Sequence, residues 1–260
     1  MKDDVAICFV GDFRYLYKYF NNMYLNVRNI GEYKGDILIL TSIFCPTFLI
    51  KQIRKKNKVK VLRFRKINFS KKAKFTMKTL NTDPDPNRYI TKKFQWHKLN
   101  LFDLRLKKWK SIFYIDLNMN IHFPLEPILI NRPNKLILAR ADSYPEYDWK
   151  LSSQFDKSNQ LYKELNKKFN LSITNYFQTG IMYIDTEIIQ KNTKKEIVEL
   201  ANEYPISKTN EQGILNLYFI FIKNHYQELV AESEGFITYF YWKIKDKSVI
   251  ITKATTEKIK

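Results

Sequence analysis

Short apolar runs alternate with stretches of helical periodicity over the first quarter of the chain. The runs at residues 5–10, 37–40 and 59–64 predict buried strands. Between them, residues 15–27 and 47–56 predict helices. Strands that alternate with helices in this way are typical of a parallel sheet with helices on both of its faces. We therefore expect an α/β fold.

The next segments continue the pattern less regularly. Residues 66–90 show no clear period and predict a long loop, of a length that is usually functional or mobile. Helical spacing returns at 94–106, directly before a buried apolar run at 112–115. The later predicted elements are strands at 136–139 and 180–184 and a helix at 211–222. Because no repeat or clear linker interrupts this order, we expect one domain over residues 1–260.

The most informative pattern follows the run at 112–115. Four polar residues, Asp116, Asn118, Asn120 and His122, alternate with apolar ones and predict an extended chain with one polar face. In open α/β sheets ligands bind outside the carboxyl ends of strands, where Asp116 would lie. Oxygens at positions i and i+2 can hold a divalent cation or the hydroxyls of a ribose. The alternative is a loop carboxylate that caps the next helix or turn.

Composition indicates a globular chain with a substantial core. Of its 260 residues, 45% are hydrophobic and 15% are aromatic. Cys8 and Cys45 lie in apolar runs, so we expect buried thiols and a reducing, cytoplasmic setting. No apolar run approaches the roughly 20 residues of a transmembrane helix.

The formal charge of +19 is weak evidence for nucleic-acid binding. Only nine of the 45 basic residues are arginine, the residue that suits bidentate phosphate or base recognition. A chain rich in Lys, Asn and Ile is typical of an AT-rich genome, and the basic run at 51–60 reads as solvated helix ends. We therefore expect no nucleic-acid partner, although a positive field favours an anionic substrate such as a nucleoside diphosphate.

Four segments occur in the order of a known family. Residues 93–99 and 112–118 resemble a lysine-bearing helix that leads into an Asp-x-Asp strand. Residues 176–184 are similar to a Phe-Asn-x-Gly-x-Met segment, and residues 210–216 to an Asp-Gln-x-x-x-Asn segment. On these motifs the chain resembles the nucleotide-sugar-dependent glycosyltransferases of the glycogenin and bacterial galactosyltransferase type, which have the A-type glycosyltransferase fold.

The resemblance implies a single Rossmann-like α/β domain with a mostly parallel central sheet flanked by helices. Its nucleotide-binding half would cover about residues 1–123, and its sugar and acceptor half about residues 124–260. The implied reaction transfers a hexose or N-acetylhexosamine from a nucleoside diphosphate sugar, expected to be a UDP-sugar. The acceptor would be a hydroxyl of a glycan, a protein or a lipid-linked molecule, and the anomeric configuration would be retained.

The resemblance also implies roles for individual residues. Those assigned to the nucleotide and its diphosphate are Val10, Gly11, Tyr15, Lys93, Asp116 and Asn118. Those assigned to the sugar and its transfer are Asp142, Gln178, Glu211 and Gln212, with Asp116 as a catalytic residue as well. Several have a structural alternative: Tyr15 as a helix-core residue, Lys93 as a surface lysine, Gln178 as a partner of backbone groups beside Gly180, and Glu211 and Gln212 as residues that open a helix.

Departures from the family pattern affect the expected metal site. Mn or Mg would bind at Asp116 and Asn118, with His122 as a further candidate ligand. Asn118 replaces a carboxylate, and Lys253 occupies the place of a metal-binding His at the end of a predicted strand, so we expect weak binding. Lys253 or Lys258 could instead supply the positive charge that a leaving diphosphate needs.

Two other functions stay open at this point. A catalytically lapsed nucleotide-sugar-binding relative is one, because the departures at 118, 178, 211 and 253 all touch the expected site. A basic nucleic-acid-binding protein is the weaker one, because its aromatic residues would have to gather on an exposed face.

Overall fold

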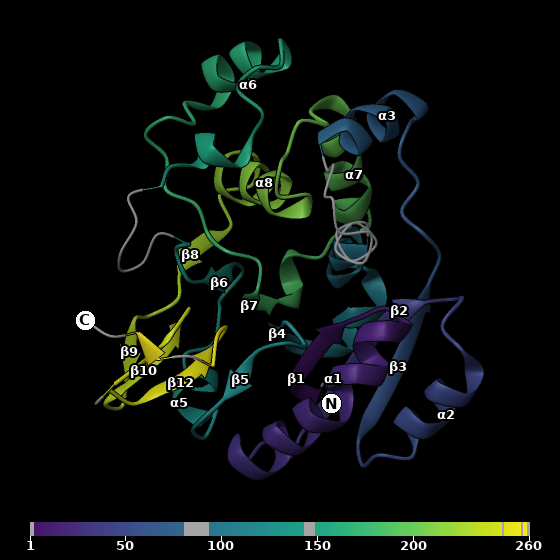
Figure 1. Ribbon diagram of the computed structural model, residues 1–260, viewed down its shortest axis with the longest axis vertical. Helices are drawn as coiled ribbons and strands as arrows, with labels where there is room; N and C mark the ends of the chain where they lie inside the picture. Colours follow the sequence, from purple (N-terminus) through teal and green to yellow (C-terminus); the bar gives the residue numbers. More distant parts are fainter. Residues whose placement is uncertain (1–2, 81–93, 143–148, 246, 256, 259–260) are drawn as a thin grey trace.

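A seven-stranded sheet in the order β3-β2-β1-β4-β7-β6-β8 forms the centre of the molecule (Figure 1). The computed structural model describes residues 3–80, 94–142, 149–245, 247–255 and 257–258. The four strands that pair in parallel are β1 (Asp3–Val10), β2 (Asp36–Ser42), β3 (Val59–Phe64) and β4 (Trp109–Ile115). The other three are β7 (Ile181–Asp185), antiparallel to β4, then β6 (Ile137–Ala139), antiparallel to β7, and β8 (Tyr226–Glu228), parallel to β6.

Helices cover both faces of this sheet because successive strand residues point to opposite sides. One hydrophobic cluster contains Cys8 and Leu40, and the other contains their neighbours Ile7 and Ile39. The helices that pack on the first cluster are α3 (Lys71–Leu80), α6 (Leu161–Phe169), α7 (Thr193–Glu203) and α8 (Glu211–Asn216). Those on the second are α1 (Phe13–Leu25), α2 (Thr47–Arg54) and α5 (Glu126–Leu129). The predicted mostly parallel α/β sheet flanked by helices is confirmed.

A smaller four-stranded sheet places the C-terminal part of the chain beside the end of β4. Its strands, in spatial order, are β5 (Asn120–Ile121), β12 (Val249–Thr252), β10 (Phe236–Phe240) and β9 (Glu232–Ser233). Because Thr252 pairs with Asn120, Lys253 is brought next to the segment that follows β4. A separate pair consists of β11 (Lys243–Ile244) and β13 (Glu257–Lys258).

Short 3₁₀ and π helices complete the described elements. The 3₁₀ helices are η2 (Trp96–Phe102), η3 (Leu104–Lys108), η4 (Leu151–Gln154) and η5 (Thr186–Ile188). The π-helical segments are η1 (Asn26–Ile30) after α1 and η6 (Leu217–Ile222) after α8.

Three predictions about local structure are wrong. The predicted loop at 66–90 is wrong for Lys71–Leu80, because Ala73 and Met77 anchor α3 in the core and the Ser70 hydroxyl accepts from the Ala73 N–H. Residues 81–90 of this prediction lie outside the described residues. Residues 94–106 do not form one regular helix, because Asp103 has extended backbone and caps a second 3₁₀ helix. Residues 116–122, predicted to form an extended chain, are not extended throughout.

A turn replaces the predicted extended chain after Asp116. The Met119 N–H donates to the Asp116 carbonyl (3.2 Å), and strand geometry resumes only at Asn120. Asn118 therefore lies on a turn beside the end of β4, and the four alternating polar side chains do not share one face.

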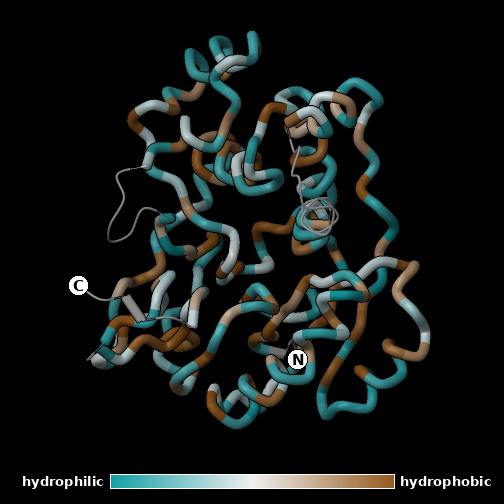
Figure 2. The backbone as a smooth tube through the Cα atoms, in the orientation of Figure 1, coloured by the Kyte–Doolittle hydropathy of each residue, from teal (hydrophilic) through white to brown (hydrophobic). Residues whose placement is uncertain are grey.

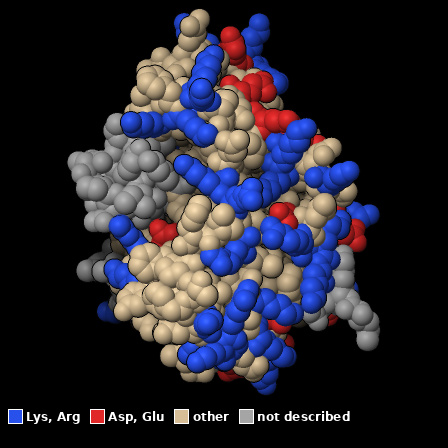
Figure 3. Space-filling view, turned by 90° about the vertical axis from the view of Figure 1, so that its right-hand side faces the viewer, with Lys and Arg blue, Asp and Glu red and all other residues tan. Residues whose placement is uncertain are grey.

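Hydropathy and charge follow the layers of the fold. Hydrophobic segments concentrate in the central sheet, whereas α6 at the top of the view is mainly hydrophilic (Figure 2). Lys and Arg side chains spread widely over the face that contains α2, β3 and α3 (Figure 3).

Cys8 and Cys45 are buried free thiols, as expected. Within the described ranges, no helix has the length and apolarity to cross a bilayer.

Candidate active site

Two adjoining cavities open at the carboxyl ends of β1 and β4. The first, which we call the β1 pocket, has a volume of about 120 Å³ and includes Val10, Gly11, Asp12, Tyr15 and Asn118 in its lining. The second, the α8 pocket, has a volume of about 340 Å³ and includes Asp142, Gln178, Thr179, Glu211 and Gln212. The described residues that line both cavities are Gln95, Lys98, Asp116 and Lys253. These four residues therefore mark the junction between the two cavities.

Asp116 directly follows β4 and faces this junction. Its Oδ1 accepts a hydrogen bond from the Tyr114 hydroxyl (2.5 Å) and lies 3.2 Å from Lys98 Nζ. Its Oδ2 accepts from Lys253 Nζ (3.0 Å). Burial alone would raise the pKa of Asp116, but the ammonium groups of Lys98 and Lys253 and the Tyr114 hydroxyl hold it far below its ordinary value. Asp116 is therefore an anion enclosed by donors.

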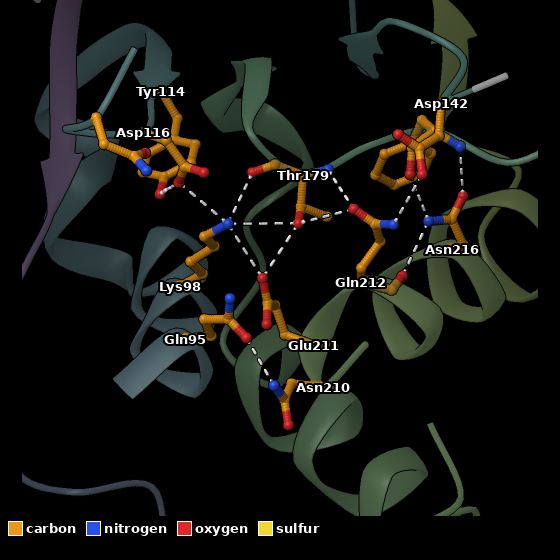
Figure 4. Close-up of polar contacts among 12 residues, drawn as sticks. Gln95, Lys98, Tyr114, Asp116, Asp142, Thr179, Asn210, Glu211, Gln212 and Asn216 are labelled. Carbon is orange, nitrogen blue, oxygen red and sulfur yellow. Dashed lines mark hydrogen bonds and ion pairs between the residues drawn. The ribbon is translucent and has the colours of Figure 1, made fainter. Parts of the chain in front are cut away.

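Lys98 is a buried cation that connects the two halves of the site (Figure 4). Its Nζ lies 3.2 Å from Asp116 Oδ1 and 3.1 Å from Glu211 Oε1, and it donates to the Thr179 carbonyl (3.1 Å). Burial opposes the charge on Lys98, but the two carboxylates outweigh it and raise the pKa of Lys98 above its ordinary value. The lysine is charged and held from three directions.

Sequence reasoning missed Lys98 and chose Lys93, which lies outside the described residues. The available signal was that Lys98 shares the helical spacing of Leu101, and both residues are buried in η2. A lysine at a core-facing position needs a buried anionic partner, because an unpaired buried charge is costly.

Glu211 and Gln212 form the first turn of α8 and contact the same threonine. Glu211 Oε1 accepts from the Thr179 hydroxyl (3.1 Å), and Gln212 Oε1 accepts from the Thr179 N–H (3.0 Å). Glu211 is only 2% exposed, and its Oε2 has no hydrogen-bond partner among the described residues. Gln212 Nε2 donates to Gln154 Oε1 (2.9 Å) and lies 3.4 Å from Asp142 Oδ2.

Asn216 fixes the strand segment that precedes Thr179. Its Oδ1 accepts from the Phe177 N–H and its Nδ2 donates to the Phe177 carbonyl, both at 2.8 Å. Because Asn216 lies one turn after Gln212 on α8, these bonds fasten the helix to the wall of the α8 pocket. Asn216 was part of a recognised motif, but sequence reasoning assigned it no role.

The sugar-side candidates lie around the α8 pocket. Asp142 and Gln178 both line it, and burial raises the pKa of Asp142 above its ordinary value. The Gln178 N–H donates to the Arg140 carbonyl (3.0 Å), which places Gln178 beside the same strand segment as Asp142. A Cβ at Gly180 would lie 2.6 Å from Met119 Cε, so glycine at this position keeps the space between Asp116 and Gln178 open.

The nucleotide-side candidates meet at the β1 pocket. Val10 ends β1, Gly11 and Asp12 form the connection to α1, and the Asp12 carboxylate caps α1 by accepting from the Tyr15 N–H (2.8 Å). A Cβ at Gly11 would lie 2.6 Å from Leu117 Cδ1, which explains the glycine. Tyr15 lines the pocket and also packs against the core, so both interpretations of this residue describe part of its surroundings.

Of the candidate metal ligands, Asp116 and Asn118 converge on the Lys253 ammonium, and His122 lies apart from them. Asn118 Oδ1 accepts from Lys253 Nζ (2.9 Å), and His122 Nε2 lies 2.9 Å from the Thr252 hydroxyl. His122 lines neither the β1 pocket nor the α8 pocket. In the part of the chain that the structure describes, no three His, Cys, Asp or Glu side chains gather in a way that could hold a metal ion.

No protein-family model matches this sequence, and neither does any curated protein. Solved glycosyltransferase structures do match its fold. The galactosyltransferase LgtC, in complex with donor and acceptor sugar analogs, aligns over 95% of this chain and 86% of its own, with a TM-score of 0.60 and 13% identity. Mouse xyloside xylosyltransferase 1 aligns over 98% of both chains, with a TM-score of 0.51 and 10% identity.

GlyE of Streptococcus pneumoniae aligns over 87% of this chain with a TM-score of 0.54 and 14% identity. The chain spans 45% of GlyE and 39% of the bifunctional glycosyltransferase WbbM, less than half of each. The specific likeness to glycogenin stays a prediction. At these identities the comparisons establish the architecture, and the chain has the fold of the A-type glycosyltransferases.

Proposed function

We propose that this protein transfers a hexose or N-acetylhexosamine from a UDP-sugar to an acceptor hydroxyl, with retention at the anomeric carbon. The observation that carries the proposal is the junction of the two cavities, where Lys98 and Lys253 lie on either side of Asp116. Lys98 is also paired with Glu211, whereas Lys253 is the more exposed cation and lines both cavities. Lys253 therefore suits an anionic group that spans both cavities, as the diphosphate of a nucleotide sugar would.

The proposed donor follows the order of the two cavities. The nucleoside would occupy the β1 pocket, beside Gly11 and Tyr15, where an aromatic ring can contact a base. The sugar would occupy the α8 pocket, where Asp142, Gln178 and Gln212 offer oxygens and amides to its hydroxyls. The diphosphate would then lie at the junction, and the acceptor would enter from the open side of the α8 pocket.

Transfer would break the bond between the anomeric carbon and the diphosphate oxygen, which keeps the electron pair. The acceptor oxygen would form the new bond on the same face of the sugar, and its proton would pass to the departing phosphate oxygen. Preorganised positive charge near that oxygen lowers the barrier. Glu211 is buried against Lys98 and Thr179, so we assign it to holding Lys98 in position, not to attack on the sugar.

Donor binding tests the proposal. We expect a UDP-sugar to raise the melting temperature, because a ligand at a hundredfold its Kd adds about 2.7 kcal/mol to the free energy of unfolding. UDP-glucose, UDP-galactose, UDP-N-acetylglucosamine and GDP-mannose form the panel. No shift with any of them at millimolar concentration would overturn the proposal.

Asp116→Asn tests the site itself. The amide has nearly the volume of the carboxylate, so the variant should fold, but it should lose transfer and donor hydrolysis. Lys195→Met, at a lysine that is 73% exposed on α7, serves as the control and should keep both activities. Donor binding by the wild-type protein without hydrolysis or transfer to any glycan, protein or lipid-linked acceptor would favour the catalytically lapsed relative.

A further inference from the structure

We infer that the Lys253 ammonium takes the place of a divalent cation at the diphosphate position, so that donor binding does not require a metal. This inference rests on the proposed function, because it assumes that the junction receives a diphosphate. It concerns the residues that the A-type fold would otherwise use for Mn or Mg, and their geometry does not fit such an ion.

The position of Lys253 is set by the tertiary structure. Strand β12 pairs with β5 through Thr252 and Asn120, and the Lys253 N–H donates to the Phe240 carbonyl (3.3 Å). These contacts place Lys253 Nζ between Asp116 Oδ2 (3.0 Å) and Asn118 Oδ1 (2.9 Å). The ammonium therefore occupies the space between the two oxygens that would have to coordinate a metal.

The remaining donors are also unsuitable for a divalent cation. Asp116 Oδ1 already accepts from Tyr114 and faces Lys98, and Asn118 contributes only a neutral oxygen. Hard cations need several oxygen ligands, preferably charged ones. A cation at Asp116 and Asn118 would also lie close to the positive charge of Lys253, which repels it.

The balance of charges at the junction explains how Lys253 could bind the oxygens of a diphosphate. Asp116 and Glu211 are matched by Lys98 and Lys253 before any substrate arrives. The Lys98 side chain is only 8% exposed and is held by three partners, whereas the Lys253 side chain is 25% exposed and lines both cavities. When an anionic diphosphate enters, Lys253 can turn to its oxygens while Lys98 continues to neutralise Asp116 and the Tyr114 hydroxyl continues to donate to it.

Calorimetric titration with UDP, in EDTA and in millimolar Mn, tests this inference without depending on activity. Wild-type protein should bind UDP with a Kd that differs by less than about threefold between the two buffers. Lys253→Met should bind UDP about tenfold to a hundredfold more weakly in EDTA, the usual loss for a hydrogen bond to a charged group. Lys195→Met should bind like the wild type.

A converse variant gives a second readout. Asn118→Asp combined with Lys253→His would present two carboxylates and an imidazole, a donor set suited to Mn. Its UDP affinity should become dependent on Mn.

Wild-type binding that needs Mn would overturn the inference and leave the proposed function intact. No UDP binding in either buffer would overturn the proposed function itself. Equal UDP affinity of Lys253→Met and wild type in EDTA would also overturn the inference.

Discussion

Lys98→Met should be among the most destabilising substitutions in this protein, because it removes the cation from two carboxylates at once. Glu211 is 2% exposed, and Lys98 Nζ lies 3.1 Å from its Oε1. Without Lys98, that oxygen keeps only the Thr179 hydroxyl among the residues that the structure describes, whereas Asp116 keeps Lys253 and Tyr114. The cost therefore falls mainly on Glu211. Removing one partner of a buried ion pair costs about 3–5 kcal/mol, and we expect a loss of that size.

Urea unfolding at pH 7, followed by circular dichroism, measures this loss. Lys195→Met breaks an exposed pair with Glu199 (3.7 Å) and should cost less than about 1 kcal/mol. Lys98→Met combined with Glu211→Gln removes the stranded charge, so the double variant should be more stable than Lys98→Met alone. The coupling energy between the two sites should be about 1–3 kcal/mol. A Lys98→Met variant within 1 kcal/mol of the wild type, or a double variant that is less stable than Lys98→Met, would refute the reasoning.

Three further predictions concern contacts around the site. Tyr114→Phe removes a hydrogen bond to a charged carboxylate and should lower the free energy of unfolding by about 1.5–3 kcal/mol, and no change in urea unfolding would contradict this. Asn216→Ala leaves the Phe177 N–H and carbonyl unpaired in the core and should cost at least about 2 kcal/mol, measured in the same way. Burial lowers the pKa of His97 from 6.5 to about 4, so the unfolded chain binds the proton more readily. The stability that neutral His97 contributes is therefore present above pH 6.5 and declines as the pH falls towards 4. We expect the wild type to lose about 2 kcal/mol more than His97→Phe between pH 7.5 and pH 5. The phenylalanine keeps a ring against Phe94, and equal losses would show that His97 does not titrate in this way.

The sequence predicted a site at the carboxyl end of β4, where the structure has the two adjoining cavities, but it did not single out Lys98. Lys93, which it did single out, lies outside the described residues. Asp116 could be predicted because an apolar strand run ends directly before it, and strand ends are where ligands bind. Helical spacing placed Lys98 on the core side of its segment, but Lys98 was missed because its partner Glu211 is far away in sequence. Lys253 was noticed through a family pattern, but its contacts with Asp116 and Asn118 depend on the pairing of β12 with β5.

The sequence by itself determined the α/β class, most strand positions and the order of the site segments. These features depend on local periodicity, since short apolar runs that alternate with helical stretches, like those that form β1 to β4, favour strands of a covered sheet. The turn after Asp116 and the break at Asp103 are accompanied by local hydrogen bonds, which periodicity does not record. Only the tertiary structure decided the charge pattern of the junction. Residues 98, 116, 211 and 253 come from different elements, and their ion pairs form because the sheet, α8 and the C-terminal strand meet at one edge.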